Sequence, residues 1–185
     1  MIDEVQANTE RKMKRAVEAL QHDLASVRTG RASPALLERV HVEYYGAPTP
    51  LNGVATITVP EPRLILIQPW DKKMLPVIEK AIQKSDLGLT PSSDGNVVRL
   101  PIPALNEERR RDLVKQVHKR VEEARVAVRN CRRDAIDELR KGEREKQISE
   151  DEVKRAQDRL QKLTDGFIAQ VDEVGKRKES EVMEI

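Results

Sequence analysis

Apolar side chains recur every three or four residues over three long stretches of the chain. Within residues 2–29 these positions are Met13, Val17, Leu20, Leu24 and Val27. The same spacing runs from residue 107 to about 141 and again from residue 150 to about 181. Such spacing places one apolar stripe along one face of a helix, which must then pack against partner helices. The pattern predicts three long amphipathic helices in an elongated bundle.

Local sequence marks the ends of the second and third helices. Ser149 followed by Glu152 is a capping box for the third helix, and Asn106 is a suitable N-cap for the second. Gly142 and the polar segment "KGEREKQ" predict a short turn between these helices. Because a short connection joins neighbouring helices, we expect the second and third helices to pack antiparallel.

Residues 31–104 have a different character. Nine of the ten prolines fall between Pro34 and Pro101, and short runs rich in β-branched and aromatic residues appear among them. These runs predict strands, and residues 71–85 carry a helical apolar spacing despite Pro76. The predicted strand segments are 39–45, 54–59, 63–68 and 96–102. The fold class is therefore α+β, an antiparallel three-helix bundle with a small inserted β/α/β domain.

The order of these elements predicts two domains joined by two chain segments. The bundle is assigned to residues 1–30 and 105–185, and the inserted domain to residues 31–104. The connections, 28–34 and 101–105, are interpreted as a hinge if few other contacts cross between the domains. The prolines in both segments fit a stiff connection equally well. The predicted hinge residues are Gly30, Arg31, Ala104 and Leu105.

The net charge of +2 conceals a strong local asymmetry. From Arg109 to Arg133 there are ten Lys or Arg residues and three acids, so this segment carries +7 and the rest of the chain −5. On a helix, the cations gather on one flank of the apolar stripe. The members of this flank are Arg111, Lys115, Arg125, Arg129, Arg132 and Arg133.

The local pairing of these arginines is unusual. Arg129 and Arg132 have no acid three or four residues away, whereas Arg125 can reach Glu122 and Arg133 can reach Asp137. The third helix has the opposite arrangement, with three acids each four residues before a cation. These expected pairs are Glu150 with Lys154, Asp151 with Arg155, and Asp158 with Lys162. The second helix therefore leaves two arginines without a local partner.

We interpret the unpaired arginines as a binding surface for a polyanion, with nucleic acid as the commonest such partner. A guanidinium group donates two parallel hydrogen bonds to phosphate and is weakly hydrated. The alternatives are a solvated basic face, or pairing with acids of a neighbouring helix. Further cations at Arg28 and Arg31, and at the first-helix positions Arg11, Lys12, Lys14 and Arg15, extend the surface if the helices bring them together.

Aromatic residues are only 2% of the chain, which disfavours recognition of single strands by base stacking. No zinc-finger, RNA-recognition or helix-turn-helix motif is present. The sequence therefore favours recognition of phosphate and shape on folded RNA.

The sequence contains few of the features that an enzyme needs. His22, His41 and His118 are far apart, no metal-binding motif is present, and no glycine-rich loop would hold a nucleotide phosphate. The single cysteine, Cys131, allows no internal disulfide and suits a reducing cytosol. No apolar run is long enough for a membrane span. We expect a cytoplasmic, non-enzymatic protein without metal or cofactor; a helical scaffold, a general RNA-binding protein and an enzyme built on the inserted domain are the alternatives.

Five segments together closely resemble the bacterial ribosome recycling factor family. They are "RTGRASPALL" (28–37), "VEYYGAPTPL" (42–51), "SDLGLTP" (85–91), "NEERRRDLVK" (106–115) and "ARVAVRNCRRDAIDEL" (124–139). The similarity extends over essentially the whole chain, including its length and domain order. Cys131 within the arginine motif and Asn106 at the start of the second helix are mild departures from the family pattern.

The resemblance implies an L-shaped molecule, similar to transfer RNA, without enzymatic activity. Members of the family bind the post-termination ribosome as monomers, on the large subunit, with the bundle against ribosomal RNA. Elongation factor G, which uses GTP, then acts with them to separate the subunits. Family arginines that contact ribosomal RNA match Arg110, Arg129 and Arg132 here, and the charge pattern adds Arg125, Arg133, Arg28 and Arg31 as candidate RNA-binding residues.

Overall fold

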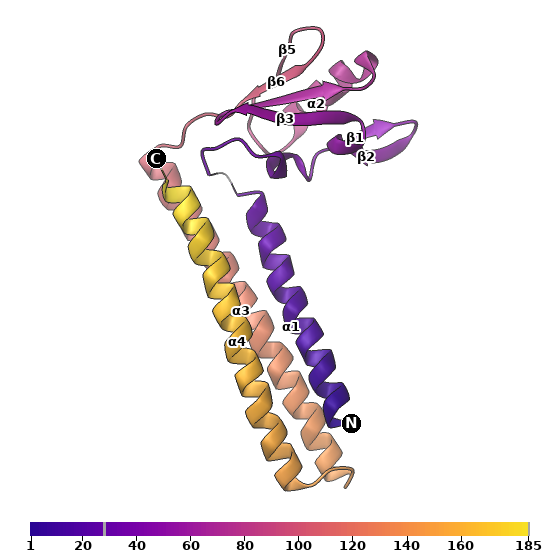
Figure 1. Ribbon diagram of the computed structural model, residues 1–185, viewed down its shortest axis with the longest axis vertical. Coiled ribbons are helices and arrows are strands. Elements are labelled where there is room, and N and C mark those ends of the chain that lie inside the picture. Colours follow the sequence, from indigo (N-terminus) through magenta and orange to yellow (C-terminus); the bar gives the residue numbers. More distant parts are fainter. Residues whose placement is uncertain (28, 185) are drawn as a thin grey trace. The chain divides into compact units, whose positions relative to one another are not determined.

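The computed structural model describes residues 1–27 and 29–184, and the chain divides into two compact units (Figure 1). The first unit combines Met1–Leu24 with Val114–Glu181, and the second combines Ala25–Leu113 with the residues from Val182 onward. The domain boundaries expected at residues 30/31 and 104/105 lie six and nine residues from the divisions at 24/25 and 113/114, and they stay a prediction.

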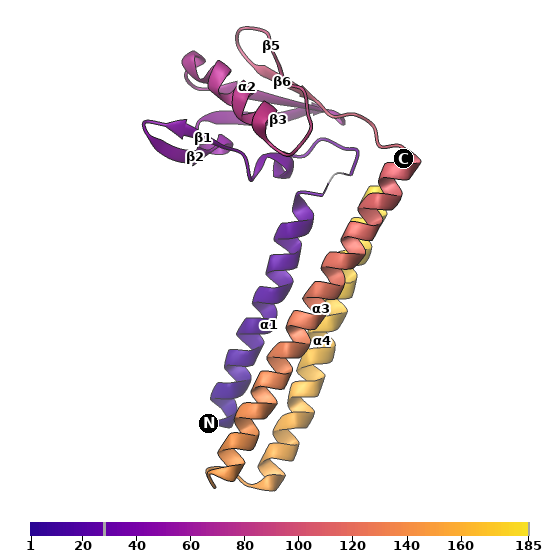
Figure 2. The same ribbon diagram turned by 180° about the vertical axis from the view of Figure 1, so that it is seen from behind.

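Three long helices make up most of the first unit: α1 (Ile2–Ala25), α3 (Glu107–Arg144) and α4 (Glu150–Met183), each of which extends at least one residue beyond it. The predicted helices are confirmed, although α1 ends at Ala25 instead of residue 29. Buried side chains from all three form one cluster, with members such as Val5 of α1, Leu139 of α3 and Leu160 of α4. The helices α3 and α4 run antiparallel beside each other in both views (Figures 1 and 2).

The predicted caps of α3 and α4 are formed. The Glu152 backbone N–H donates to Ser149 Oγ (3.1 Å), and the Ser149 backbone N–H donates to Glu152 Oε1 (3.3 Å). At the start of α3, Asn106 Oδ1 accepts from the Arg109 backbone N–H at 2.7 Å. Each cap satisfies donors that the first helical turn leaves unpaired.

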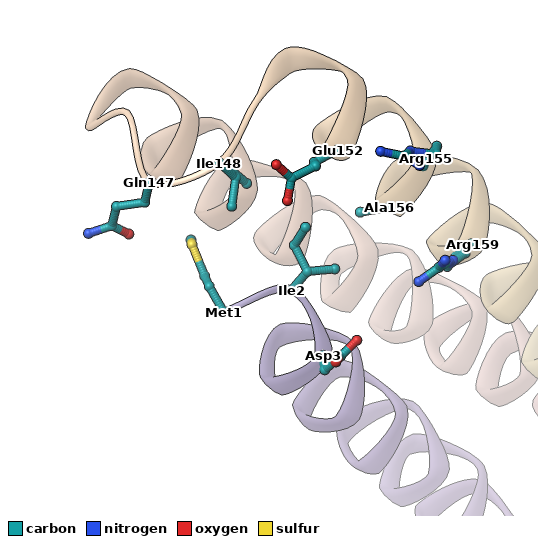
Figure 3. A pocket seen from close by; sticks show the side chains of 9 residues that line it. All are labelled: Met1, Ile2, Asp3, Gln147, Ile148, Glu152, Arg155, Ala156 and Arg159. Atoms are coloured by element: carbon teal, nitrogen blue, oxygen red, sulfur yellow. The ribbon is translucent and has the colours of Figure 1, made fainter.

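The turn between α3 and α4 begins later than the sequence indicated. Gly142 was expected in the turn, but it is a buried residue of α3, where an added Cβ would meet the Met1 side chain. The helix ends in a Schellman motif, because the Gln147 N–H donates to the Gly142 carbonyl and the Lys146 N–H to the Glu143 carbonyl. Lys146 takes the left-handed position, with φ of 59°. Figure 3 shows Met1 beside this turn.

The second unit contains two antiparallel sheets. β1 (His41–Tyr44) pairs with β2 (Ala47–Pro50). The larger sheet has the order β3-β4-β6-β5 and consists of β3 (Ala55–Glu61), β4 (Leu64–Pro69), β6 (Val98–Pro101) and β5 (Ser92–Ser93). The four predicted strand segments are confirmed as β1, β3, β4 and β6. β2 and β5 were missed, since β2 contains two prolines and β5 has only two residues.

The single helix expected between β4 and β6 is also present. It is α2 (Leu75–Lys84), preceded by a 3-10 turn over Lys72–Met74. Pro76 lies in the first turn of α2, where its missing N–H costs nothing. Two further 3-10 turns, Pro34–Leu37 and Leu51–Gly53, precede and follow the small hairpin.

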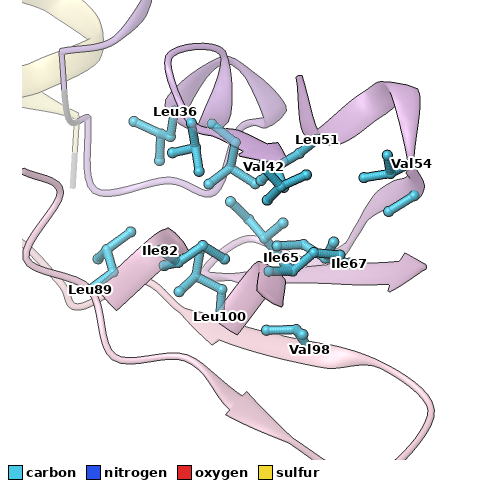
Figure 4. Packing of buried hydrophobic residues seen from close by; sticks show 14 of the residues in the cluster. Leu36, Val42, Leu51, Val54, Ile65, Ile67, Ile82, Leu89, Val98 and Leu100 are labelled. Carbon is cyan, nitrogen blue, oxygen red and sulfur yellow. The ribbon is translucent and has the colours of Figure 1, made fainter. Parts of the chain in front are cut away.

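The core of the second unit lies between α2 and the sheets. Alternate residues of β4 and β6 point inward, and Ile65, Ile67, Val98 and Leu100 are fully buried (Figure 4). Ile82 of α2 packs against them. Burial of each such side chain stabilises the unit by about 1.5–3 kcal/mol. The chain is therefore an α+β protein with a three-helix bundle interrupted in sequence by a small domain with its own core.

Candidate nucleic-acid interface

The central turns of α3 carry four arginines, called here the arginine surface: Arg125, Arg129, Arg132 and Arg133. The buried face of this helix includes Val121, Ala124 and Val128, which pack into the first unit. The arginines fall beside this face. Arg125 and Arg132 are half-buried, whereas Arg129 and Arg133 are exposed. The helix therefore holds four guanidinium groups along the edge of its packed face.

Arg125 is the best compensated of these residues. Its Nε donates to Asp172 Oδ1 of α4 at 2.7 Å, and its Nη1 donates to Glu122 Oε2 at 3.0 Å. The hydrogen bond to Glu122, followed by that to Asp172, raises the pKa of the Arg125 guanidinium above its ordinary value. Arg125 is thus tied to α4, and it matches the alternative of pairing with an acid of a neighbouring helix.

The prediction that Arg129 lacks a partner was wrong. Its Nη1 lies 3.6 Å from Glu122 Oε1, the same carboxylate that Arg125 uses. A spacing of seven residues is about two helical turns, which returns to nearly the same face, and the long arginine side chain spans the distance. The pair is long and both side chains are well exposed, so it contributes little to stability.

Arg132 has the environment that the sequence indicated. No carboxylate of the described residues pairs with it, and its Nε atom is buried without a hydrogen-bond partner. A buried donor left unsatisfied costs about 1–3 kcal/mol. The side chain of Arg132 is half-buried, and no carboxylate in the described part of the chain compensates its charge.

The expected contrast between α3 and α4 is not observed. The pair of Arg133 with Asp137 is not formed among the described residues, and neither are the three pairs expected in α4. Arg155 donates instead to the backbone carbonyl of Asp151 at 3.4 Å. Exposed side chains with the right spacing gain too little from pairing to be held in one geometry.

Two other candidate arginines lie in the second unit. Arg31 and Arg110 line a hollow of about 280 Å³ together with Arg63. Arg31 Nη2 lies 3.5 Å from Glu184 Oε2, whereas Arg110 Nε is buried without a partner. Arg63 was not identified from the sequence, because backbone pairing brings it here. The Ile102 N–H donates to the Arg63 carbonyl (2.8 Å), and the Ala32 N–H donates to the adjacent Pro62 carbonyl (2.6 Å). Arg28 lies outside the described residues.

The predicted hinge residues gather around the same hollow. Gly30, Arg31, Ala104 and Leu105 all line it. Gly30 has φ of 78°, and a Cβ at this position would lie 3.5 Å from Leu105 Cγ. The glycine is therefore needed for its backbone conformation, and the hinge role itself stays a prediction.

Three of the four candidate cations of α1 lie against α3, although no arginine of α3 lines the same hollow. Arg11, Lys12 and Arg15 line a hollow of about 380 Å³ with Cys131 of α3. Asp134 and Glu138 line it too, so its charge is mixed. Burial raises the pKa of the Cys131 thiol, and the nearby charge of Lys12 partly offsets this rise.

Three of the four aromatic residues are exposed on the second unit. Tyr44, Tyr45 and Trp70 are 37%, 90% and 68% exposed. Trp70 Nε1 donates to Thr56 Oγ1 at 3.0 Å, and the rings of Tyr44 and Tyr45 meet edge to face. Base stacking is therefore disfavoured by the small number of aromatic residues and not by their burial.

Within the described residues, no group of three or more His, Cys, Asp or Glu side chains is arranged to hold a metal ion. His118 instead lies 3.1 Å from Glu179 Oε2 on α4. No helix in residues 1–27 and 29–184 combines the length and apolar character needed to cross a membrane.

Comparisons with known proteins agree with the sequence motifs. The family model described as "Ribosome recycling factor" matches residues 20–183. Ribosome-recycling factors of Heliobacterium modesticaldum and Chloroflexus aurantiacus are each 60% identical over 185 residues, which covers all of this chain and all of theirs.

Solved structures of the same kind are similar along the full chain. A solution structure of ribosome recycling factor superposes with a TM-score of 0.82 at 47% identity, over 100% of this chain and 98% of that one. The recycling factor of T. thermophilus, with E. coli elongation factor G on the E. coli post-termination complex, gives 0.69 at 50% identity over the whole of both chains. The chain belongs to the ribosome recycling factor family.

Proposed function

We propose that this chain binds the post-termination ribosome and, together with elongation factor G and GTP, promotes separation of the subunits for a new round of translation. Family membership over the full length supports this activity. The T. thermophilus relative, 50% identical to this chain, is described with elongation factor G on a post-termination complex. The arginine surface supplies the contact with ribosomal RNA, and we place that contact on the large subunit.

The environment of Arg132 is the main support for the proposed RNA contact. Its side chain is half-buried, and its Nε atom has lost solvent without gaining a partner. Much of the ordering and desolvation that binding normally costs has therefore been met in the free protein. A phosphate group would compensate the charge at little further cost. Arg129 and Arg133, both exposed, extend the surface along α3, while Arg110 and Arg31 form a second basic site in the other unit.

The chain itself performs no chemistry in this proposal. It acts as a monomer in the cytoplasm and needs no cofactor, because GTP is hydrolysed by elongation factor G. The segments 28–34 and 101–105 serve as a hinge. When elongation factor G pushes on the inserted domain, this domain moves about the hinge and disturbs the contacts between the ribosomal subunits.

Ribosome binding tests the arginine surface. Co-sedimentation of Arg132→Ala with ribosomes across a salt series should show weaker binding and a salt slope reduced by about one unit. The control is Arg177→Ala, which removes an exposed cation of α4 that already has Glu173 as a partner at 3.4 Å. Affinity of Arg132→Ala equal to wild type at every salt concentration would contradict the proposed contact.

Subunit splitting tests the hinge. Gly30→Ala forces a side chain into a left-handed backbone conformation, at a cost of about 1–2 kcal/mol, and should slow splitting driven by elongation factor G while sparing binding. Gly95→Ala is the matched control, since Gly95 has φ of 95° in the β5–β6 loop. Equal splitting rates for the two variants would remove the hinge from the mechanism.

A further inference from the structure

The hairpin of β1 and β2 has two edges of different character. Its register pairs Tyr44 with Ala47 across a two-residue loop of Tyr45 and Gly46. In such a hairpin the closing pair is hydrogen-bonded, and hydrogen-bonded and non-hydrogen-bonded pairs then alternate along the ladder. Val42 and Thr49 form the next hydrogen-bonded pair. The other two pairs, Glu43 with Pro48 and His41 with Pro50, are the non-hydrogen-bonded ones, and their backbone groups point away from the partner strand.

On β2 these outward positions are Pro48 and Pro50. Proline has no backbone N–H, so the outer edge of β2 offers no donor at either position and cannot be extended by another strand. On β1 the equivalent positions are His41 and Glu43. Both have a backbone N–H, and no partner of either N–H is found among the described residues. One edge of the hairpin is blocked, and the other is open.

The open edge of β1 borders a groove. A hollow of about 580 Å³ runs between β1 and α2, two neighbouring elements of the second unit. Its exposed apolar surface comes mainly from Val77 and Ala81 of α2, because Val40 and Val42 also line the hollow but are buried. Val77 is 37% exposed although it is aliphatic. The four residues of β1 span about 13 Å, enough for an added strand of about four residues.

Cations surround this groove. Lys80 and Lys84 of α2 line it, and neither forms an ion pair with a described residue. Arg39 lines the same hollow, and Glu43 is its only carboxylate among the lining residues. The groove therefore combines unpaired strand donors, an apolar floor and a positive rim.

We propose that this groove binds an extended acidic segment of another protein as an added strand. The segment's carbonyl groups accept from the His41 and Glu43 N–H groups, which supplies affinity independent of sequence. Because side chains alternate along a strand, one set packs on Val77 and Ala81 while the other places carboxylates near Lys80 and Lys84. Pairing with a second copy of this chain is disfavoured, because it would bring two lysine rims together.

A model peptide tests the chemistry directly. The probe is an acetylated and amidated hexapeptide of alternating glutamate and valine, added to the full chain labelled with nitrogen-15. We expect saturable shifts of the His41 and Glu43 amides, and about tenfold slower hydrogen exchange at both at saturation. A twin peptide with lysine in place of glutamate should bind at least about tenfold more weakly.

Variants of Glu43 and N-methylated peptides test whether the N–H groups of β1 bind the added strand. Glu43→Pro removes one outward N–H without removing a ladder hydrogen bond, as Pro48 does on the partner strand. The variant should abolish the peptide-dependent exchange protection at His41, the amide that remains measurable. Glu43→Thr keeps the donor and removes the acid, so it should bind at least as tightly as wild type. Against the wild-type chain, a peptide N-methylated on the edge facing β1 still offers its carbonyls but clashes sterically with the strand, and should bind about tenfold more weakly than one methylated on the opposite edge.

Three results would overturn the proposal: no binding of the acidic peptide, binding without effect on the β1 amides, or equal binding of the lysine twin. A dimer in sedimentation that Glu43→Pro dissociates would assign the edge to self-association instead. The affinity of Glu43→Pro for the ribosome should equal that of wild type, since the arginine surface lies on α3. The strand-binding proposal and the proposed RNA contact can therefore be tested independently of each other.

Discussion

Gly175 of α4 packs directly against Val121 of α3. A Cβ built on Gly175 would lie 2.5 Å from Val121 Cγ2, too close for any real contact, and the two other carbons of that isopropyl group would lie at 3.7 Å. Glycine in a helix interior costs about 1 kcal/mol relative to alanine. Here that cost is offset by the close approach of two helices that alanine would prevent.

Gly175→Ala should therefore destabilise the bundle. Overpacking costs about 1–3 kcal/mol, which outweighs the gain of about 1 kcal/mol in helix propensity. Urea denaturation followed by circular dichroism measures the change in the free energy of unfolding. Val121→Ala in the same chain should recover part of the loss.

Gly166→Ala provides the matched control for this prediction. Gly166 lies in the same helix, and an added Cβ would have no neighbour within 4 Å. The variant should gain up to about 1 kcal/mol from propensity alone. Equal effects of the two glycine substitutions would show that the close approach to Val121 has no energetic role.

The sequence predicted those parts of the fold that depend on periodicity and on short-range capping. The three long helices and the cap at Ser149 follow from spacing of apolar residues and from local hydrogen bonds. The end of α3 could not be located, because Gly142 is a turn residue by propensity but lies inside the helix, close to Met1 from the other end of the sequence. β2 was missed since its two prolines occupy positions that need no donor, a fact visible only with the register.

The arginine surface was predicted in outline, but not in its pairing. Glu122 of the same helix reaches Arg129 because two turns separate them, and a search over three or four residues overlooks this carboxylate. Arg125 forms an ion pair with Asp172 of α4, and this pair depends on how α3 and α4 pack against each other. Side-chain pairing between elements depends on tertiary packing, which a charge pattern along one helix does not contain.

Lys146→Gly should stabilise the chain. Lys146 occupies the left-handed position of the Schellman motif with φ of 59°, where a side chain costs about 1 kcal/mol relative to glycine. A gain of about 1 kcal/mol is expected to raise the melting temperature by about 2–4 °C. As a control, Lys141→Gly lies in the last turns of α3 and should lose about the same amount. A fall in melting temperature for Lys146→Gly would mean that its side chain makes a contact worth more than the backbone strain.

Asp94 should make stability depend on acid pH. Its Oδ1 accepts from the backbone N–H groups of Val97 (3.1 Å) and Asn96 (3.2 Å), and these two bonds, with a smaller effect from Arg99, lower the pKa of Asp94 below 3.8. A lowered pKa in the folded state means that the stabilisation is complete above the unfolded pKa and is lost as pH falls through the folded value.

The test compares wild type with Asp94→Asn. The difference in their free energies of unfolding should be constant above about pH 5 and should shrink below pH 4. Carboxyl NMR titration should place the pKa of Asp94 below 3.8, and in Arg99→Gln it should remain low because the backbone donors are the larger cause. An ordinary pKa for Asp94 in Arg99→Gln would assign the effect to the guanidinium instead.

Asp172→Asn should strengthen ribosome binding. Asp172 lies 2.6 Å from Arg125 Nη2 and compensates one of the four arginines on the α3 surface. Removing its charge leaves Arg125 more available to phosphate, with an expected gain of about two- to fivefold in affinity at low salt and a loss of at most about 1 kcal/mol in stability.

The control is Glu173→Gln, which changes the net charge equally but belongs to the pair with Arg177. Because both variants carry the same total charge, any general electrostatic attraction to the ribosome affects them alike. An increase specific to Asp172→Asn, measured by co-sedimentation over a salt series, assigns the effect to Arg125; equal affinities would show that Arg125 takes no part in binding.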